Sequence, residues 1–215
     1  MKKNLLNVFS SSFFILITVL SFALLLHACK SKSTYKPESE ASVEQVSYTQ
    51  EELMIKGKEI AGQINASLQE ALKKAIEEKG FEGAISFCSL KAIPITDSIS
   101  QKENVLIQRV SHKARNPENQ AGSEDMKIIE RYLQISQDTL AKKQATMVAQ
   151  HEKKIFYAPI YVANSLCLNC HGKPDKEILP SLGKAIAEKY PDDQATGFTM
   201  NDFRGLLKIE FKKKF

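Results

Sequence analysis

The sequence lacks the motifs that usually mark an enzyme. Its 215 residues contain no serine–histidine–aspartate arrangement, no paired-carboxylate motif and no phosphate-binding loop. The excess of one sign of charge over the other is also small. The chain has 30 basic and 25 acidic residues, and Lys2 and Lys3 are the charged residues among the first 28, so the remainder carries 28 basic residues against 25 acidic ones. This net charge of +3, without a basic patch interleaved with aromatics, is too small to predict nucleic-acid binding. We expect neither an enzyme nor a nucleic-acid-binding protein.

Cysteine is scarce too, with four in the chain. Two belong to the run CLNCH at residues 167–171, a CxxCH motif of the kind that attaches a c-type haem. Cysteines three residues apart lie on one face of a helical turn, where both thiols can form thioethers with haem vinyl groups. The adjacent histidine can then reach the iron. We predict one covalent haem c, bound by Cys167, Cys170 and His171, with His171 as the proximal ligand.

The start of the chain predicts export, which covalent haem attachment requires. An uncharged apolar stretch over residues 5–26 ends in Leu26-His27-Ala28-Cys29, which is similar to a lipoprotein cleavage box. We expect a signal peptide over residues 1–28 and a lipid on Cys29. An uncleaved transmembrane anchor is the alternative, because the stretch is just long enough to cross a bilayer. Both interpretations tether the chain to a membrane, facing the periplasm or the exterior, and Lys30 favours the outer membrane.

The rest of the chain divides into a tether and one domain. Residues 29–48 are polar and predict a flexible tether, and residues 49–215 are long enough to bury one core. With Cys29 assigned to lipid and two cysteines to haem, only Cys88 remains. No intramolecular disulfide is therefore expected, despite the oxidising compartment.

Periodicity and turn signals predict an α+β domain. Thr49 and Glu52 form a capping box for a long helix that Gly80 ends. A second helix is expected from about Glu82 through Leu90; Pro94 restricts its continuation, and a further helical stretch through Ile99 is the alternative. Ser123 is expected to cap a further helix. Strands are predicted over residues 105–110, in a hairpin over 145–162, and in the alternating segment 207–212, whose lysines should face water. A short helix is expected around 182–188. This order predicts helices around an antiparallel sheet.

The sixth ligand of the iron stays open at this point. Cys88, His112, His151 and several methionines are candidates, and a cysteine on an apolar helix is more often a small hydrophobic residue. His112 and His151 lie beside lysines and are expected to be solvated. A zinc site built from CxxCH, Cys88 and His151 is an alternative to haem.

Two arginines could contact the cofactor. Arg109 and Arg115 could pair with haem propionates or with a thiolate, because guanidinium forms bidentate bonds with carboxylates. The alternative is that both lie on the surface or at a sheet edge.

Beyond CxxCH, the chain carries a set of short segments in a fixed order. They are residues 84–88, 109–119, 158–160, 167–172, 190–197 and 204–205. In this combination the chain resembles exported monohaem c-type cytochrome domains with a PAS-like fold, over about residues 50–211. The resemblance implies a PAS-like antiparallel sheet flanked by helices. It also implies an iron held by the CxxCH histidine and a distant cysteine, which in this sequence are His171 and Cys88.

These observations predict a membrane-tethered monohaem cytochrome that transfers electrons to redox partner proteins or reports redox state. A thiolate ligand would push electron density onto the iron and give a low potential, and a six-coordinate iron would leave no position for a substrate. A haem-based redox or gas sensor with a labile thiolate ligand is the first alternative. A small haem peroxidase is the second.

Overall fold

The computed structural model describes residues 48–135 and 144–212. The predicted signal peptide, Cys29 and nearly all of the tether lie outside these residues. The elements are helix α2 (Gln50–Glu103), strand β1 (Val105–Val110), the 3₁₀ helix η1 (Pro117–Asn119), helix α3 (Ser123–Gln134), strands β2 (Thr146–Gln150) and β3 (Lys153–Tyr161), helices α5 (Ser165–His171) and α6 (Pro180–Lys189), and strand β4 (Phe203–Phe211). None of the helices in the described part of the chain is both long and apolar enough to cross a bilayer.

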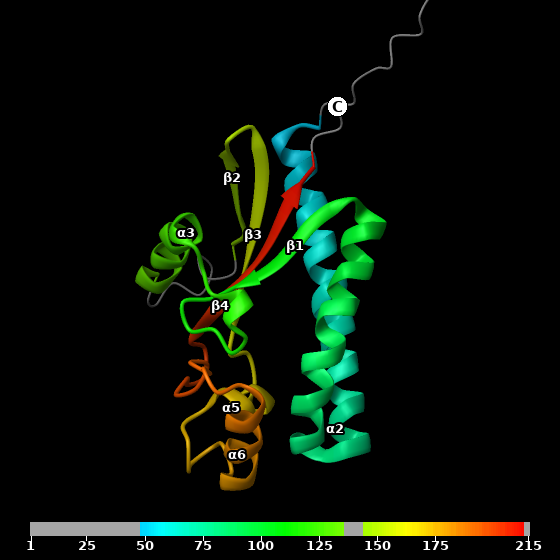
Figure 1. Cartoon of the computed structure of the whole chain (residues 1–215). Coiled ribbons are helices and arrows are strands. Elements are labelled where there is room, and N and C mark those ends of the chain that lie inside the picture. The colour runs from blue at the N-terminus through cyan, green and yellow to red at the C-terminus, as the bar shows by residue number, and fades with distance from the viewer. Residues whose placement is uncertain (1–47, 136–143, 213–215) are drawn as a thin grey trace, which may run out of the picture. The chain divides into compact units, whose positions relative to one another are not determined.

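Helix α2 is a hairpin of two antiparallel helices, as the cyan and green ribbons of Figure 1 show. The predicted capping box is confirmed: the Thr49 hydroxyl accepts a hydrogen bond from Glu52 N–H, and the Glu52 carboxylate accepts one from Thr49 N–H at 2.8 Å. Gly80 breaks the helix with φ 69°, a value that glycine adopts without strain. The ion pair of Lys56 and Glu103, at 2.6 Å, joins the two far ends.

The second helix of the hairpin runs through Pro94 to its end at Glu103, which matches the alternative of a further helical stretch and extends it past Ile99. Proline removes the donor for the carbonyl four residues earlier, which belongs to Leu90. Leu90 is 67% exposed, so this turn of the helix faces water, which can satisfy a backbone carbonyl. The prediction that Ser123 caps α3 is wrong by one residue, because the N-cap residue is Gly122.

The four strands form one antiparallel sheet in the order β1-β4-β3-β2. The predicted strand at 105–110, the hairpin and the terminal strand are all confirmed, and the architecture is the predicted α+β fold, PAS-like, with helices flanking the sheet. Strand β4 is central and pairs with β1 on one side and β3 on the other, so the end of the chain completes the sheet.

Helices cover both faces of the sheet. On one face, Ile60 and Ile64 of α2 pack with Phe156, Leu207 and Ile209, and on the other face α3 packs against the strands. The second cluster contains Val110, Ile128, Ile129, Tyr132, Ile155, Tyr157, Phe203 and Leu206. Successive strand residues therefore point into different cores, as the two-residue period requires.

The prediction that the lysines of β4 face water is wrong for Lys208, because α3 covers that face. Lys208 pairs with Asp125 of α3 at 2.8 Å, and Asp125 also accepts a hydrogen bond from the Tyr157 hydroxyl at 2.8 Å. Burial and the Asp125 carboxylate raise the pKa of Tyr157 well above its ordinary range, so the hydroxyl remains a donor.

Two glycines of α2 provide a matched test of this packing. A Cβ at Gly57 would lie 2.5 Å from the Phe156 ring, whereas a Cβ at Gly62 would meet nothing within 4 Å. Gly57→Ala should lower the free energy of unfolding by about 1–3 kcal/mol through overpacking. Gly62→Ala should raise it by about 0.5–1 kcal/mol, because alanine favours the helix. Urea unfolding checks both values, and equal stability of the two variants would contradict the packing of α2 on the sheet.

Candidate functional site

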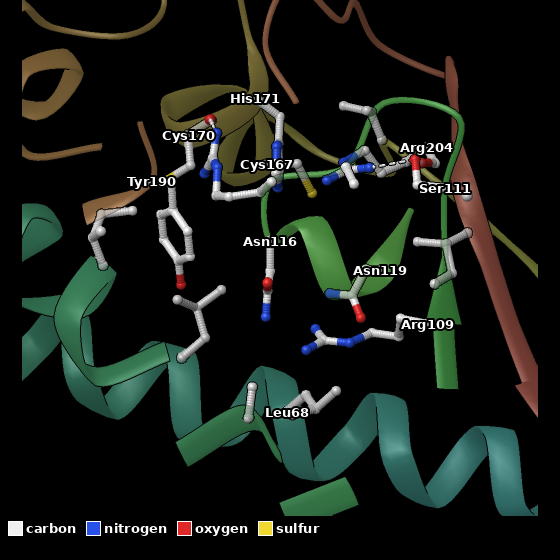
Figure 2. Close-up of a pocket in the computed structure, with 18 of the residues that line it drawn as sticks. Leu68, Arg109, Ser111, Asn116, Asn119, Cys167, Cys170, His171, Tyr190 and Arg204 are labelled. Atoms are coloured by element: carbon white, nitrogen blue, oxygen red, sulfur yellow. Dashed lines mark hydrogen bonds between the residues drawn. The ribbon is translucent and has the colours of Figure 1, made fainter. Parts of the chain in front are cut away.

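A cavity of about 450 Å³ lies between the α2 hairpin, β1 with the loop that follows it, the start of β4, and α5 (Figure 2). Four predicted site residues line it: Arg115, Cys167, Cys170 and His171. These residues come from segments more than 50 positions apart in the sequence, and the fold brings them to one wall.

The CxxCH motif forms the short helix α5, which follows β3 directly. Neither Cys167 nor Cys170 is in a disulfide; both are half-buried, and both contribute to the cavity wall. Gly172 ends the helix, and its N–H donates to the Leu168 carbonyl at 2.8 Å. The predicted helical turn is therefore present, and both thiols and the histidine are available on the same cavity.

His171 is held by its ring nitrogen Nδ1, which lies 2.7 Å from the Ala195 carbonyl oxygen. A carbonyl accepts only, so Nδ1 carries the proton and Nε2 keeps its lone pair. Burial, together with the positive charges of Arg204 and Arg115, holds the pKa of His171 well below its ordinary value. The imidazole is thus neutral and in the tautomer that can bind a metal through Nε2.

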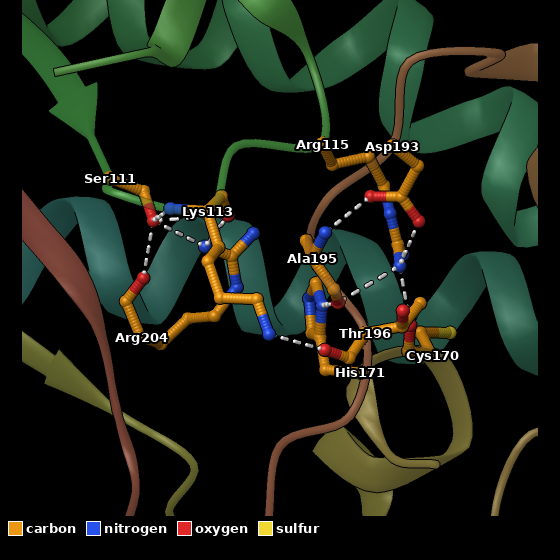
Figure 3. A network of polar contacts seen from close by, with 9 residues as sticks. All are labelled: Ser111, Lys113, Arg115, Cys170, His171, Asp193, Ala195, Thr196 and Arg204. Atoms are coloured by element: carbon orange, nitrogen blue, oxygen red, sulfur yellow. Dashed lines mark hydrogen bonds and ion pairs between the residues drawn. The ribbon is translucent and has the colours of Figure 1, made fainter. Parts of the chain in front are cut away.

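The loop of residues 193–198 carries this acceptor and is fixed on two sides (Figure 3). Toward the segment after β1, Gln194 N–H donates to the Ala114 carbonyl at 2.9 Å, and Lys113 Nζ donates to the Thr196 carbonyl at 2.9 Å. Toward α5, Phe198 N–H donates to the His171 carbonyl at 2.9 Å. The loop therefore joins the segment after β1 to the end of the CxxCH helix.

Arg115 is the residue that links all three of these segments. Its Nη2 carries two hydrogens and lies within hydrogen-bonding distance of three acceptors, the Cys170 carbonyl at 2.5 Å, Asp193 at 3.0 Å and the Ala195 carbonyl at 3.3 Å, so one hydrogen is shared between two of them. The ion pair with Asp193 is almost buried, with side-chain exposures of 13% and 8%. Arg115 thus contacts the backbone of the CxxCH helix and the acceptor of His171 at once.

Arg204 is a cavity residue that the sequence analysis did not select. Strand β3 pairs Ile160 with Gly205 and then Tyr161 with Phe203, so Arg204 is the extra residue of a β-bulge. A bulge redirects a side chain, and here the guanidinium reaches the cavity. Its Nη1 donates to Ser111 Oγ at 2.8 Å and to the Lys113 carbonyl at 2.9 Å.

The bulge requires glycine at the next position. Gly205 has φ 155°, and a Cβ there would lie 2.6 Å from the Val110 carbonyl oxygen. The pair Arg204-Gly205 is one of the segments on which the sequence resemblance rests. That resemblance was the sequence signal from which Arg204 could have been selected as a site residue.

Positive charge accumulates at this wall of the cavity. Arg109 from β1 also lines it, and Figure 2 shows its guanidinium pointing inward. Burial and the charges of Arg115 and Arg109 lower the pKa of Arg204 to about 10. Such mutual destabilisation of cations is relieved by a bound anion.

The opposite wall is apolar and comes from both halves of α2. Its side chains are Leu68, Leu72, Ile76, Ala84, Ile85, Ala92 and Ile93. Cys88 lies in α2 four residues after Ala84 and four before Ala92, so its helical position falls on the face that lines the cavity. The structure describes the backbone at Cys88 and not its side chain, and its role as a ligand stays a prediction.

Other predicted ligand candidates lie elsewhere. His151 is exposed in the turn between β2 and β3, at the far end of the sheet from α5, so it cannot complete the alternative zinc site. Met200 is 42% exposed, and Met54, Met126 and Met147 pack against the two sheet cores. Among the side chains that the structure describes, which do not include that of Cys88, no three from His, Cys, Asp or Glu are grouped so that they could hold a metal ion.

The expectation that His112 is solvated is wrong. Its ring stacks on Phe203, with centroids 6.0 Å apart, and meets Phe198 edge-on at 6.4 Å. Its Nδ1 is buried without a hydrogen bond to any described residue. It belongs to this aromatic cluster and does not line the cavity of His171.

Comparisons with known proteins identify relatives of this architecture. Residues 39–211 match the family model described as Tll0287-like. The fold is similar to the crystal structure of the cyanobacterial heme-protein Tll0287, with a TM-score of 0.55 and 23% sequence identity, over 78% of this chain and 98% of that one. At this identity the structural likeness shows the fold. No curated protein matches the chain.

Lowering the pH should weaken the fold in part through His112. Burial and the charges of Arg204 and Lys113 hold the pKa of His112 below its ordinary value of 6.5, so the unfolded chain binds this proton at a higher pH than the folded chain does. The stability that the fold gains from keeping His112 neutral is fully present above pH 6.5 and is lost as the pH falls below it, by up to about 1.4 kcal/mol per pH unit. In urea unfolding, His112→Phe, which keeps the ring, should show a shallower loss below pH 6.5; an unchanged pH dependence would contradict this.

Proposed function

This chain belongs to the Tll0287-like family, and we propose that it is a haem protein that holds one haem in the cavity of His171. One observation carries the proposal. A neutral imidazole, fixed through Nδ1 to the Ala195 carbonyl, lies on the wall of a cavity that also holds the two thiols of a CxxCH motif. This combination matches the requirements of covalent haem attachment and of a proximal histidine.

The two walls of the cavity fit the chemistry of a haem. A haem is an apolar ring with two carboxylates on one edge. The apolar side chains of α2 match the ring, and the guanidinium groups of Arg109, Arg115 and Arg204 match the carboxylates. Within the described residues, Nε of Arg115 and Nε of Arg204 are buried without a hydrogen bond, so both have donors to offer an acidic ligand.

The residues of α5 would hold the cofactor. Each thiol of Cys167 and Cys170 would add across one vinyl group, its sulfur bonding to one carbon and its hydrogen going to the other, with no change in oxidation state. His171 would bind the iron through Nε2, and the Ala195 carbonyl would keep the ring in that orientation. When bound, haem iron supplies one-electron redox chemistry.

Cys88 is our candidate for the second iron ligand. Its position on the cavity face of α2 supports this assignment, together with the resemblance of residues 84–88. A thiolate there would favour ferric iron and give a low potential. The apolar wall of α2 would exclude water from the iron, which suits an electron carrier or redox reporter better than an enzyme.

We further propose that the protein is exported and anchored to a membrane, facing the periplasm or the exterior. The apolar stretch at residues 5–26 and the cleavage box ending at Cys29 support this location, with the outer membrane favoured. Redox proteins in the same compartment would then be its partners.

Haem attachment and anchoring can be tested on one preparation. The full chain is co-expressed with a cytochrome c maturation system, purified from membranes and digested for mass spectrometry. We expect haem to remain on the peptide with Cys167 and Cys170 after denaturation, and acyl chains on Cys29. The double variant Cys167→Ser, Cys170→Ser should lose the covalent haem. A colourless parent protein would refute the haem proposal, and an intact Met1 would refute the cleaved lipoprotein.

The ligand role of Cys88 predicts a change in spectrum and potential. Cys88→Ala should keep covalent haem, because attachment uses the other two cysteines, but should shift the ferric absorption and raise the midpoint potential. Ser86→Ala, on an exposed position of the same helix, is the matched control and should change neither. An unchanged spectrum in Cys88→Ala would contradict the assignment. Carbon monoxide binding to the reduced parent would favour the sensor alternative over the electron carrier.

A further inference from the structure

We propose that the Arg115–Asp193 ion pair is a positioning unit that tunes the iron ligand His171 through the carbonyl of Ala195. This inference rests on the proposed function and assigns a role to side chains that need not touch the iron. Arg115 was predicted as a cofactor-binding residue because it can pair with carboxylates. The structure shows that one of its terminal nitrogens already contacts three acceptors of the protein.

The Ala195 carbonyl is the shared acceptor. It receives Nδ1–H of His171 at 2.7 Å and Nη2–H of Arg115 at 3.3 Å. Ala195 is fully buried, so water does not compete for this oxygen. A carbonyl oxygen has two lone pairs, and both are used here by donors, one of them cationic.

Asp193 fixes the other side of the same peptide unit. Its Oδ1 accepts the Ala195 N–H at 2.8 Å, and its Oδ2 accepts Arg115 Nη2 at 3.0 Å. The backbone of Ala195 is therefore held through both its N–H and its carbonyl by one ion pair (Figure 3). Arg115 also holds the Cys170 carbonyl at 2.5 Å, so the position of the acceptor is tied to that of the CxxCH helix.

This geometry has an electronic consequence for His171. A strong hydrogen bond from Nδ1–H gives the imidazole more anionic character, which stabilises ferric iron. A guanidinium at the same carbonyl draws electron density away from the His171 bond and adds a positive charge near the site. Both effects favour the ferrous state. The carboxylate of Asp193 opposes them by neutralising part of the guanidinium charge.

The test compares the parent with four variants, all as the full chain matured with covalent haem. Arg115→Gln removes the charge and the fork of donors, and Arg115→Lys keeps the charge. Asp193→Asn removes the opposing charge while its side-chain oxygen can still accept the Ala195 N–H. Lys113→Gln is the matched control, because it loses one positive charge and one bond to the neighbouring Thr196 carbonyl and leaves the Ala195 carbonyl untouched.

Two readouts separate tuning from a purely structural role. The first is the midpoint potential. It is measured as the ratio of ferric to ferrous protein at the solution potential at which half of the parent protein is reduced. The second is the proton NMR signal of His171 Nδ1–H in the reduced protein, which moves downfield as its hydrogen bond strengthens. For Arg115→Gln we expect the ratio to rise about tenfold, which corresponds to about 1.4 kcal/mol.

The variants should fall in a defined order. Arg115→Lys should show a smaller rise than Arg115→Gln, Asp193→Asn should lower the ratio, and Lys113→Gln should shift the ratio less than threefold without moving the His171 signal. The inference is overturned if Arg115→Gln shifts the potential no more than Lys113→Gln, or if the His171 signal stays in place. If Arg115→Gln does not fold, an unchanged or lower potential in Asp193→Asn overturns it. A parent without haem would instead overturn the proposed function.

Discussion

The hydrogen bond from His171 to the Ala195 carbonyl is the interaction on which the rest of the site depends. It sets the tautomer of the imidazole, leaves Nε2 free and fixes the plane of the ring. The bond forms only because residues 193–198 are held between the segment after β1 and the end of α5. Those contacts act together with the packing of Cys167 and Leu168 against Val162, Ala195 and Phe198, which also holds the seven-residue helix α5 beside the cavity.

The α2 hairpin and the sheet form opposite walls of the cavity. The apolar residues of α2 lie along one face of the helix. Ile60 and Ile64 pack on the sheet, and Leu68 and Leu72, one and two turns further on, line the cavity. The sheet supplies the charged wall. The bulge at Arg204, made possible by Gly205, redirects a cation into the cavity at the start of the strand that supplies Leu206, Leu207 and Ile209 to the core.

Local signals in the sequence predicted the elements and the first part of the site. The capping box at Thr49, the break at Gly80, the alternation of β4 and the CxxCH motif each act over a few residues, and the structure confirms the elements they predict. The outcomes that sequence did not foresee depend on distant partners. Lys208 pairs with Asp125 because α3 covers the sheet. The links of Arg115 to Asp193 and of His171 to Ala195 span 78 and 24 positions, and no local pattern encodes them.

The central claim is that one iron occupies the cavity beside His171. Anomalous X-ray diffraction at the iron absorption edge, from crystals of the chain matured with haem, tests it most directly. The account predicts a single iron peak in the cavity between α2 and α5, bound by His171 Nε2 while Nδ1 remains on the Ala195 carbonyl. An iron peak outside this cavity, or a His171 ring turned away from the iron, would contradict it.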